Sequence, residues 1–171
     1  MANDMNLYLK PLTILDVTQA YVDWFKDTEV VRFSENQYRS FTLQSQKDYV
    51  SSCSANEDIE LFGIFDARKH IGNVALAGLC SHHNRAEVTY MIGDRDYWGK
   101  GTASYAVSEV VKIAARDYNL NKLVAGAVGA NIGSLRVLEK NGFVLEGVRL
   151  KHLLYHGIFY DQHDYGLMLD I

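Results

Sequence analysis

The most informative part of the sequence is residues 87–111, EVTYMIGDRDYWGKGTASYAVSEVV. An apolar run comes first, followed by a charged turn, two glycines around a lysine, and a segment rich in alanine and valine. Backbone N–H groups at the start of a helix bind anions, and glycine lets a phosphate approach without a Cβ in the way. The sequence therefore predicts a phosphate-binding loop at Gly99 and Gly101. Lys100 either adds positive charge beside it or is a solvated loop lysine.

Two common phosphate loops do not fit this stretch. A Walker A loop has four residues between its first glycine and a Gly-Lys pair that precedes Ser or Thr, whereas five residues separate Gly93 from Gly99, and Gly101 follows the lysine. A dinucleotide fingerprint has a third glycine where Ser104 stands here. It also has an acid at the tip of the next strand, where residues 128–129 are Val-Gly. A different phosphate-binding family is therefore indicated.

The pattern around this loop predicts an α/β chain with a mixed sheet. The chain has no repeat and no proline-rich linker, so we expect one domain over residues 1–171. The predicted elements are, in order, an edge strand at 7–12, a helix after an Asp16 cap, a helix after Thr42, a hairpin from Ile59 to Cys80 around the turn DARKH, a strand at 87–92, a helix at 102–118, a strand at 121–128, a helix from Asn131 closed by Asn141-Gly142, and a last hairpin around His156-Gly157.

Composition excludes several classes of protein. The 171 residues are 48% hydrophobic and 22% charged, as in a globular domain, and the net charge of -4 argues against general nucleic-acid binding. No apolar run is long enough to span a membrane, and MANDMNLYLKPL does not resemble a signal peptide, so we expect a soluble cytoplasmic protein. Cys53 and Cys80 are expected to be reduced core thiols. His82 and His83 are expected to point apart in a turn, so no metal site is predicted.

Three stretches together carry a family resemblance. They are YWGKGTASYAV, NIGSLRVLEKNGF about thirty residues later, and the tail LEGVRLKHLLYHGIFYDQHDYGLML. In this order they resemble the Gcn5-related N-acetyltransferase (GNAT) superfamily and its RimJ/RimL-type branch, over essentially the whole chain from LYLKPLTILD onward. The resemblance implies a single GNAT-like domain. Its mixed, mostly antiparallel seven-stranded sheet would be flanked by about four helices and splayed between strands 4 and 5.

The resemblance also implies acetyl-CoA as co-substrate. In the family, the loop amides hold the coenzyme A pyrophosphate, and the strand before the loop pairs with the pantetheine arm through its backbone. The residues that inherit a role in binding coenzyme A are Met91, Ile92, Gly93, Gly99, Lys100, Gly101, Thr102, Ala103, Asn131 and Ser134. Many relatives begin the loop with Arg or Gln where Trp98 stands here. We expect Trp98 to pack against the sheet rather than to contact phosphate.

Acetyl transfer needs an acid to protonate the departing thiolate, and the usual one is missing here. Superfamily members often place a tyrosine four residues after the small residue of an Asn-x-x-Ala/Ser motif, and that position is Leu138. Ser134 is the replacement candidate, and Asn131 would bind either the pantetheine amides or the surroundings of the thiolate. Both are also good helix-capping residues. The candidates for the base are Glu87, which alternatively is a solvated acid, and His152, which alternatively is a hydrogen-bonded strand histidine.

The sequence supports one main function and two alternatives. The main reading is an N-acetyltransferase that moves an acetyl group to a primary amine by direct attack in a ternary complex, with a protein N-terminal α-amine favoured. Tyr38, Arg39 and Tyr155 are the candidate acceptor contacts, and a homodimer is possible. The alternatives are an acetyltransferase for a small amine, such as an amino-sugar nucleotide or an antibiotic, and a non-catalytic acyl-CoA-binding module. No membrane or metal is implied.

Overall fold

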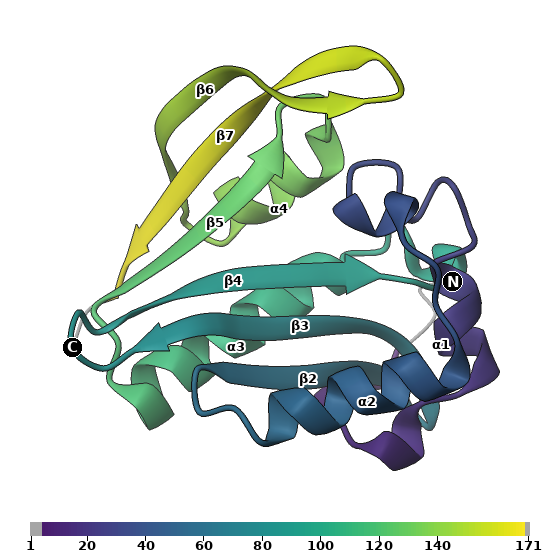
Figure 1. Cartoon of the computed structure of the whole chain (residues 1–171). Helices are drawn as coiled ribbons and strands as arrows, with labels where there is room; N and C mark the ends of the chain where they lie inside the picture. The colour runs from purple at the N-terminus through teal and green to yellow at the C-terminus, as the bar shows by residue number, and fades with distance from the viewer. Residues whose placement is uncertain (1–4, 170–171) are drawn as a thin grey trace.

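Seven strands form one open sheet in a computed structural model that describes residues 5–169, with the order β1-β2-β3-β4-β5-β7-β6 (Figure 1). The strands are β1 (Leu7–Pro11), β2 (Ile59–Asp66), β3 (Lys69–Cys80), β4 (Arg85–Ile92), β5 (Lys122–Val128), β6 (Val144–Tyr155) and β7 (Ile158–Met168). The helices are α1 (Gln19–Trp24), α2 (Leu43–Ser54), α3 (Thr102–Tyr118) and α4 (Ile132–Lys140), with short 3₁₀ turns at Ile14–Asp16, Glu35–Tyr38 and Arg95–Tyr97. The predicted order of helices and strands is confirmed.

The sheet is split between its fourth and fifth strands. β4 and β5 are parallel and pair only where Arg85–Glu87 meets Lys122–Val124, whereas every other neighbouring pair is antiparallel. Beyond this short contact the two strands diverge, so the sheet opens like a V (Figure 1). The predicted mixed, mostly antiparallel sheet with a splay at this place is confirmed.

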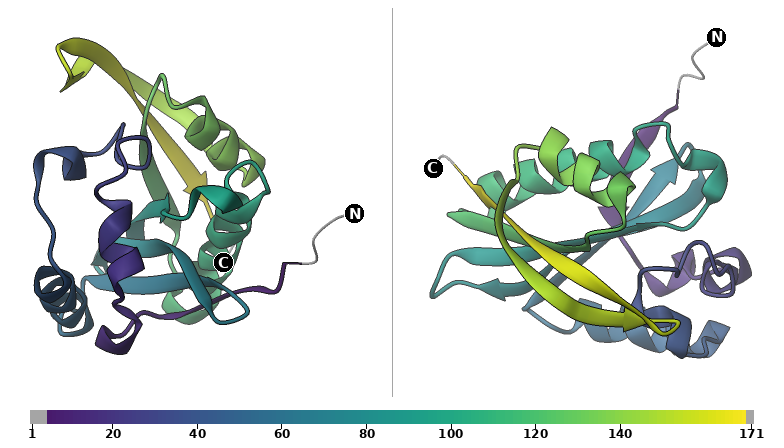
Figure 2. Two further views of the ribbon diagram at one scale, coloured as in Figure 1. Left: turned by 90° about the vertical axis from the view of Figure 1, so that its right-hand side faces the viewer. Right: turned by 90° about the horizontal axis from the view of Figure 1, so that it is seen from above.

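Helices cover both faces of the sheet (Figure 2). α3 and α4 lie on one face, where Val107, Val110 and Leu138 are completely buried. α1 and α2 lie on the other face, over a second core that includes Tyr21 and Val50. Because side chains alternate along a strand, one strand can supply both cores. In β2, Phe62 and Ile64 belong to the first core, whereas Leu61 and Phe65 belong to the second. The two layers meet at the open end of the splay.

The first helix begins two residues later than predicted. The Thr18 hydroxyl accepts from the Tyr21 backbone N–H and is the N-cap of α1. Asp16 ends the preceding 3₁₀ turn, where its carboxylate pairs with Lys10 at 2.6 Å and accepts from the Thr13 N–H at 3.0 Å. The Asp16 cap was a wrong prediction, because this carboxylate is already used by the turn before the helix.

Other predicted boundaries are confirmed. Thr42 caps α2 through its hydroxyl, and Gly142 ends α4 in the left-handed region at φ 83°. His156 and Gly157 both have positive φ, at 50° and 77°, as a tight two-residue hairpin turn requires.

Two smaller predictions need correction. Cys53 is buried, but Cys80 is only half-buried at the end of β3. The rings of His82 and His83 do not point apart, because they make an edge-to-face contact at 4.9 Å. Within residues 5–169, no three His, Cys, Asp or Glu side chains gather as metal ligands do. No helix in the same range combines the length and apolar character needed to cross a membrane.

Candidate active site

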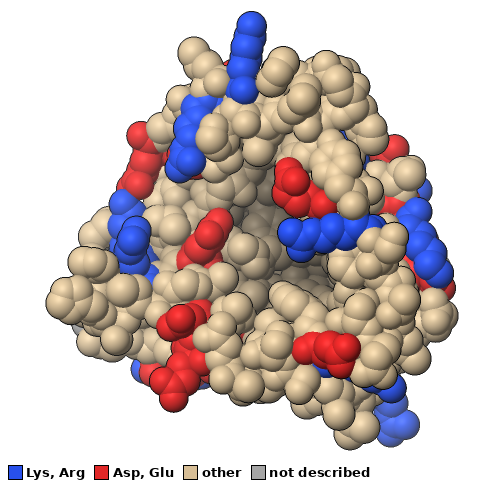
Figure 3. Space-filling model, in the orientation of Figure 1, with Lys and Arg blue, Asp and Glu red and all other residues tan. Residues whose placement is uncertain are grey.

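A cavity of about 1100 Å³ opens at the splay between β4 and β5. Figure 3 shows this face hollowed at its centre, with acidic and basic side chains on the rim. One lobe lies on the α3 and α4 side and is lined by Trp98, Gly99, Gly101, Thr102, Ala103, Ser104, Asn131, Ser134, Arg136 and Lys140. The other lies on the α1 and α2 side and is lined by Tyr21, Phe25, Gln46, Tyr49, Asn73, Ala75, Thr89 and Met91. The gap between the strands joins the two lobes.

The glycine loop forms an anion site at the start of α3. Gly99 and Gly101 have φ of 69° and 82°, and Gly101 is the N-cap of the helix. The first intrahelical bond runs from the Tyr105 N–H to the Gly101 carbonyl, so the N–H groups of the first turn have no helical partner. A Cβ on either glycine would meet no atom within 4 Å, which leaves space for a ligand. The predicted loop therefore has the geometry that phosphate binding needs.

Two basic side chains on α4 complete this lobe. Arg136 and Lys140 are one turn apart on one face of the helix, and both line the cavity. Asn141 donates to the Ser104 hydroxyl at 3.3 Å, which holds the end of α4 against the first turn of α3. Lys100, in contrast, is exposed and is absent from the cavity wall. This exposure fits the alternative of a solvated loop lysine. The sequence analysis missed the pair on α4, which was recognisable as two cations at i and i+4.

The backbone of β4 corrects part of the predicted pantetheine contact. The Gly93 N–H donates to the Ile71 carbonyl at 3.0 Å, so Gly93 faces β3. Backbone groups alternate along a strand, so Met91 also faces β3, whereas Ile92 and Tyr90 face the open gap. The prediction that Met91 and Gly93 pair with the arm through their backbone is wrong. The backbone groups of Ile92 and Tyr90 are the ones that face the gap.

Gly93 has a packing role instead. A Cβ at this position would overlap the indole ring of Trp24. The glycine thus lets α1 pack closely against the end of β4, which fixes the wall of the second lobe.

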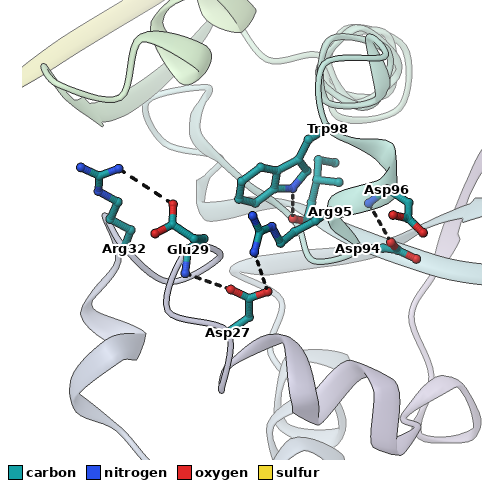
Figure 4. Close-up of polar contacts among 8 residues, drawn as sticks. Asp27, Glu29, Arg32, Asp94, Arg95, Asp96 and Trp98 are labelled. Atoms are coloured by element: carbon teal, nitrogen blue, oxygen red, sulfur yellow. Dashed lines mark hydrogen bonds and ion pairs between the residues drawn. The ribbon is translucent and has the colours of Figure 1, made fainter.

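Trp98 connects the loop to the sheet. Its indole N–H donates to the Ile92 carbonyl at 2.8 Å, and the Arg95 guanidinium lies 5.4 Å from the centre of the indole ring. Arg95 in turn pairs with Asp27, which follows α1, at 3.5 Å (Figure 4). Trp98 contacts the end of β4, as predicted, and it is also part of the cavity wall. Because the Trp98 indole occupies the Ile92 carbonyl, the backbone N–H of Ile92 is the group left to face the gap.

Ser134, Asn131 and Tyr90 come together at the gap. The Asn131 Oδ1 accepts from the Ser134 backbone N–H at 3.2 Å and caps α4, so its amide Nδ2 is the group left to donate into the cavity. The Ser134 and Tyr90 hydroxyls are 2.7 Å apart, and either one can be the donor. The Tyr90 hydroxyl also lies 3.2 Å from the Ser134 carbonyl, which is an alternative acceptor for its single proton. Burial raises the pKa of Tyr90, and its bond to Ser134 opposes that shift. The phenol therefore keeps its proton at neutral pH.

Leu138, at the position where many relatives carry a tyrosine, cannot act as the general acid. Leu138 is completely buried in the core between α4 and the sheet and does not line the cavity. The hydroxyls nearest the gap are those of Ser134 and Tyr90. Tyr90 was missed by the sequence analysis because it is 44 residues from Ser134, and only the sheet brings them together.

The two candidate bases lie at different distances from the site. Glu87 is on the same face of β4 as Thr89 and Met91, which line the cavity, but its exposed side chain is one strand position outside the wall. His152 is exposed on β6, in an irregular part of the outer hairpin, and does not line the cavity. The structure therefore places Glu87 beside the site and His152 away from it.

Of the three residues predicted to contact the acceptor, one lines the cavity and two do not. Arg39 lines the cavity, whereas Tyr38 and Tyr155 do not. The Tyr38 hydroxyl donates to the Leu154 carbonyl at 3.2 Å, and its ring stacks on that of Tyr155 at 6.3 Å. Burial and a hydrogen bond to Glu35 raise the pKa of Tyr155 to about 12. These two tyrosines join the segment between α1 and α2 to the last hairpin and do not line the cavity, so only Arg39 of the three predicted acceptor contacts lies on its wall.

Comparison with known proteins agrees with this geometry. The family model described as an acetyltransferase (GNAT) domain matches residues 6–144. The probable N-acetyltransferase YjcK of Bacillus subtilis (strain 168) is 30% identical over 176 residues, which cover 94% of this chain and 93% of that protein. The chain belongs to the GNAT acetyltransferase family. It is therefore an acyltransferase enzyme.

Solved structures confirm the GNAT fold over nearly the whole chain. The ribosomal-protein-S5-alanine acetyltransferase from Vibrio fischeri has a TM-score of 0.84 at 23% identity, covering 96% of this chain and 93% of that one. The spermidine N-acetyltransferase from Vibrio cholerae, in complex with CoA and spermine, has a TM-score of 0.83 at 19% identity, covering 95% of each chain. These two GNAT enzymes have different acceptors in their names, so the shared fold does not determine the acceptor.

Proposed function

We propose that this GNAT enzyme is of RimJ/RimL type and transfers an acetyl group from acetyl-CoA to a primary amine, with a protein N-terminal α-amine as the preferred acceptor. The observation that supports it is one cavity in which an anion-binding loop and a second, mostly uncharged lobe meet at a gap in the sheet. Coenzyme A would occupy the first lobe and the amine the second. The nitrogen attacks the thioester carbon directly, without a covalent enzyme intermediate.

Each group around the gap has a proposed role. The N–H groups at the start of α3 bind the pyrophosphate, with Arg136 and Lys140 as counter-charges for further phosphate. Free backbone groups of Tyr90 and Ile92 hold the pantetheine arm, and one N–H stabilises the developing oxyanion. Ser134 donates a proton to the leaving thiolate. Glu87 takes the proton of the attacking amine through a water molecule, since it lies just outside the wall.

The charge of the second lobe favours an acceptor that is not a polycation. Among the described residues that line the cavity, Glu29 is the only carboxylate, and it pairs with Arg32 at 3.9 Å. Arg39 lines the same region and adds positive charge. A polyamine carries several positive charges and needs several carboxylates to replace its hydration. An N-terminal peptide does not, and this difference supports the α-amine over spermidine.

The basicity of the acceptor gives a testable prediction. An α-amine with a pKa of about 8 is partly neutral at pH 7, whereas a lysine amine near 10.4 is almost wholly protonated, a difference of roughly two orders of magnitude in neutral amine. We expect kcat/KM to be highest for a peptide with a free α-amine, and to level off above about pH 8. A peptide blocked at its N-terminus but carrying lysine should be poor at pH 7 and should improve up to about pH 10.

The measurement is steady-state acetylation across pH 6 to 10 with these two peptides, spermidine and an amino-sugar nucleotide. The sugar nucleotide tests the small-amine alternative directly. Highest kcat/KM for spermidine or the blocked lysine peptide at neutral pH would contradict the proposed acceptor. Binding of acetyl-CoA without release of thiol to any of the four would favour the non-catalytic module.

The outer hairpin supports a homodimer. Among residues 5–169, eight of the fifteen exposed large apolar side chains lie on β6 and β7, namely Val144, Leu145, Val148, Leu150, Leu154, Ile158, Phe159 and Met168. β6 is also an edge strand of the sheet. Large exposed apolar patches next to a free edge favour association. We expect light scattering to give twice the chain mass of 19.3 kDa, and Leu150→Lys to shift the mass toward that of the monomer.

A further inference from the structure

One buried polar side chain in the acceptor lobe has an unused acceptor atom. Within residues 5–169, three side chains have an enclosed oxygen or nitrogen without a hydrogen-bond partner: Gln37, Gln46 and His70. Of these, only Gln46 lines the cavity. Its side chain is 3% exposed, and the unpartnered atom is the carbonyl oxygen Oε1.

The position of Gln46 on its helix is one where the fold favours an apolar residue. Gln46, Val50 and Cys53 follow one another at i, i+4 and i+7 and form the buried stripe of α2. Val50 and Cys53 are core residues. A buried carbonyl without a partner destabilises a fold, so packing does not explain why a glutamine stands there. A ligand that supplies the missing donor does explain it.

Two other polar side chains of this lobe, Asn73 and Tyr21, already have partners within the protein. The Asn73 Oδ1 contacts the His70 Nε2 at 2.7 Å, and the Asn73 side chain also interacts with the Tyr21 hydroxyl. His70 itself lies outside the cavity wall, packed against Tyr21 and Trp24. The Gln46 carbonyl oxygen, in contrast, has no hydrogen-bond donor among the described residues. The ligand group that fits it is an N–H or O–H donor.

Gln46 is on the α2 side of the sheet, whereas the acetyl group is expected at the gap beside Ile92 and Ser134. The donor that reaches Gln46 is therefore a group beyond the reacting nitrogen. In a peptide with a free α-amine, the next donor along the chain is the amide N–H of the second residue. We propose that Gln46 is a specificity-determining residue that accepts a hydrogen bond from this amide, an inference that rests on the proposed N-terminal acceptor.

The test uses Gln46→Met, which keeps the size of the side chain and removes its polar groups. With an Ala-Ala peptide as acceptor, kcat/KM should fall about 10- to 100-fold, mainly through KM for the peptide, because one hydrogen bond to a buried group is lost. KM for acetyl-CoA should not change. The melting temperature of the free enzyme should stay equal or rise, because no protein hydrogen bond is broken and a buried orphan oxygen is removed. Gln44→Met, on the exposed side of the same helix, is the matched control and should behave as wild type.

A second peptide identifies the donor. Methylation of the second-residue nitrogen removes the N–H, so the wild-type enzyme should prefer the unmethylated Ala-Ala peptide by about 10- to 100-fold, and Gln46→Met should lose this preference. An equal preference in both enzymes would overturn the inference, as would unchanged kinetics or a melting temperature lowered by more than about 4 °C in Gln46→Met. Failure of the wild-type enzyme to acetylate either peptide, while it acetylates another amine, would instead refute the proposed N-terminal acceptor.

Discussion

Gly101→Val should abolish the stabilisation that CoA gives to the wild-type enzyme. At 100 times its dissociation constant, a ligand that binds only the folded state stabilises it by about 2.7 kcal/mol, which for a chain of this size is roughly 5 to 10 °C in melting temperature. Gly101 is the N-cap of α3, and the space next to it is open. A valine side chain would fill the space that the pyrophosphate needs, so this rise should disappear.

The substitution also strains the backbone, and a control separates the two effects. Gly101 has φ of 82°, where an L-residue costs about 1 to 2 kcal/mol, so the free variant should melt a few degrees lower. Gly157, in the turn between β6 and β7, has φ of 77° and similarly open space around it. Gly157→Val should therefore show the same loss of stability and should keep the full CoA shift.

The measurement is thermal unfolding of the wild type and both variants with and without CoA, together with calorimetric titration. Folded Gly101→Val protein that binds CoA with wild-type affinity would refute the assignment of the loop. Loss of the CoA shift in Gly157→Val as well would show that backbone strain, rather than the blocked site, causes the effect.

The local parts of the fold were predictable because their signals are local. Glycines before an amphipathic segment predicted the loop and α3, and His156-Gly157 predicted the last hairpin. The splay between the fourth and fifth strands came from the family resemblance rather than from periodicity. The predicted helix cap at Asp16 was wrong because two residues only two positions apart, Asp16 and Thr18, both suit a cap, and the choice depends on the 3₁₀ turn and on Lys10.

The parts of the site that the sequence did not predict depend on register and on long-range contacts. Whether Met91 or Ile92 faces the gap is decided by the pairing of β4 with β3, and a shift of one residue reverses the answer. The cation pair on α4 is visible in the sequence as two cations at i and i+4, but its place beside the loop is recognisable only once the cavity is known, as is the orphan oxygen of Gln46. Tyr38 and Tyr155 appeared suitable for a ligand because aromatic side chains often are, but their own mutual packing uses them.

Ser134→Ala should lower kcat about 10- to 1,000-fold, with a much smaller change in KM for acetyl-CoA. The reason is that the hydroxyl donates the proton to the departing thiolate, a contribution made in the transition state. The helix cap should survive, since the bond to the Asn131 Oδ1 comes from the backbone N–H of residue 134. Ser134→Thr, which keeps a hydroxyl, should retain more activity than Ser134→Ala. A loss confined to KM would make Ser134 a binding residue only.

Tyr90 determines how the Ser134 proton is directed. If the phenol donates to the Ser134 Oγ, at 2.7 Å, the serine proton is free to point toward the sulfur. Tyr90→Phe should then lower kcat less than Ser134→Ala, and the double variant should be no worse than Ser134→Ala alone, because the two hydroxyls act as one unit. Burial raises the pKa of Tyr90, so the phenol stays protonated below its raised pKa, and kcat should show no loss from its ionisation between pH 7 and about 10. Additive losses in the double variant would mean that each hydroxyl reaches the thiolate separately, and Tyr90 would then be a second acid rather than the residue that positions the first.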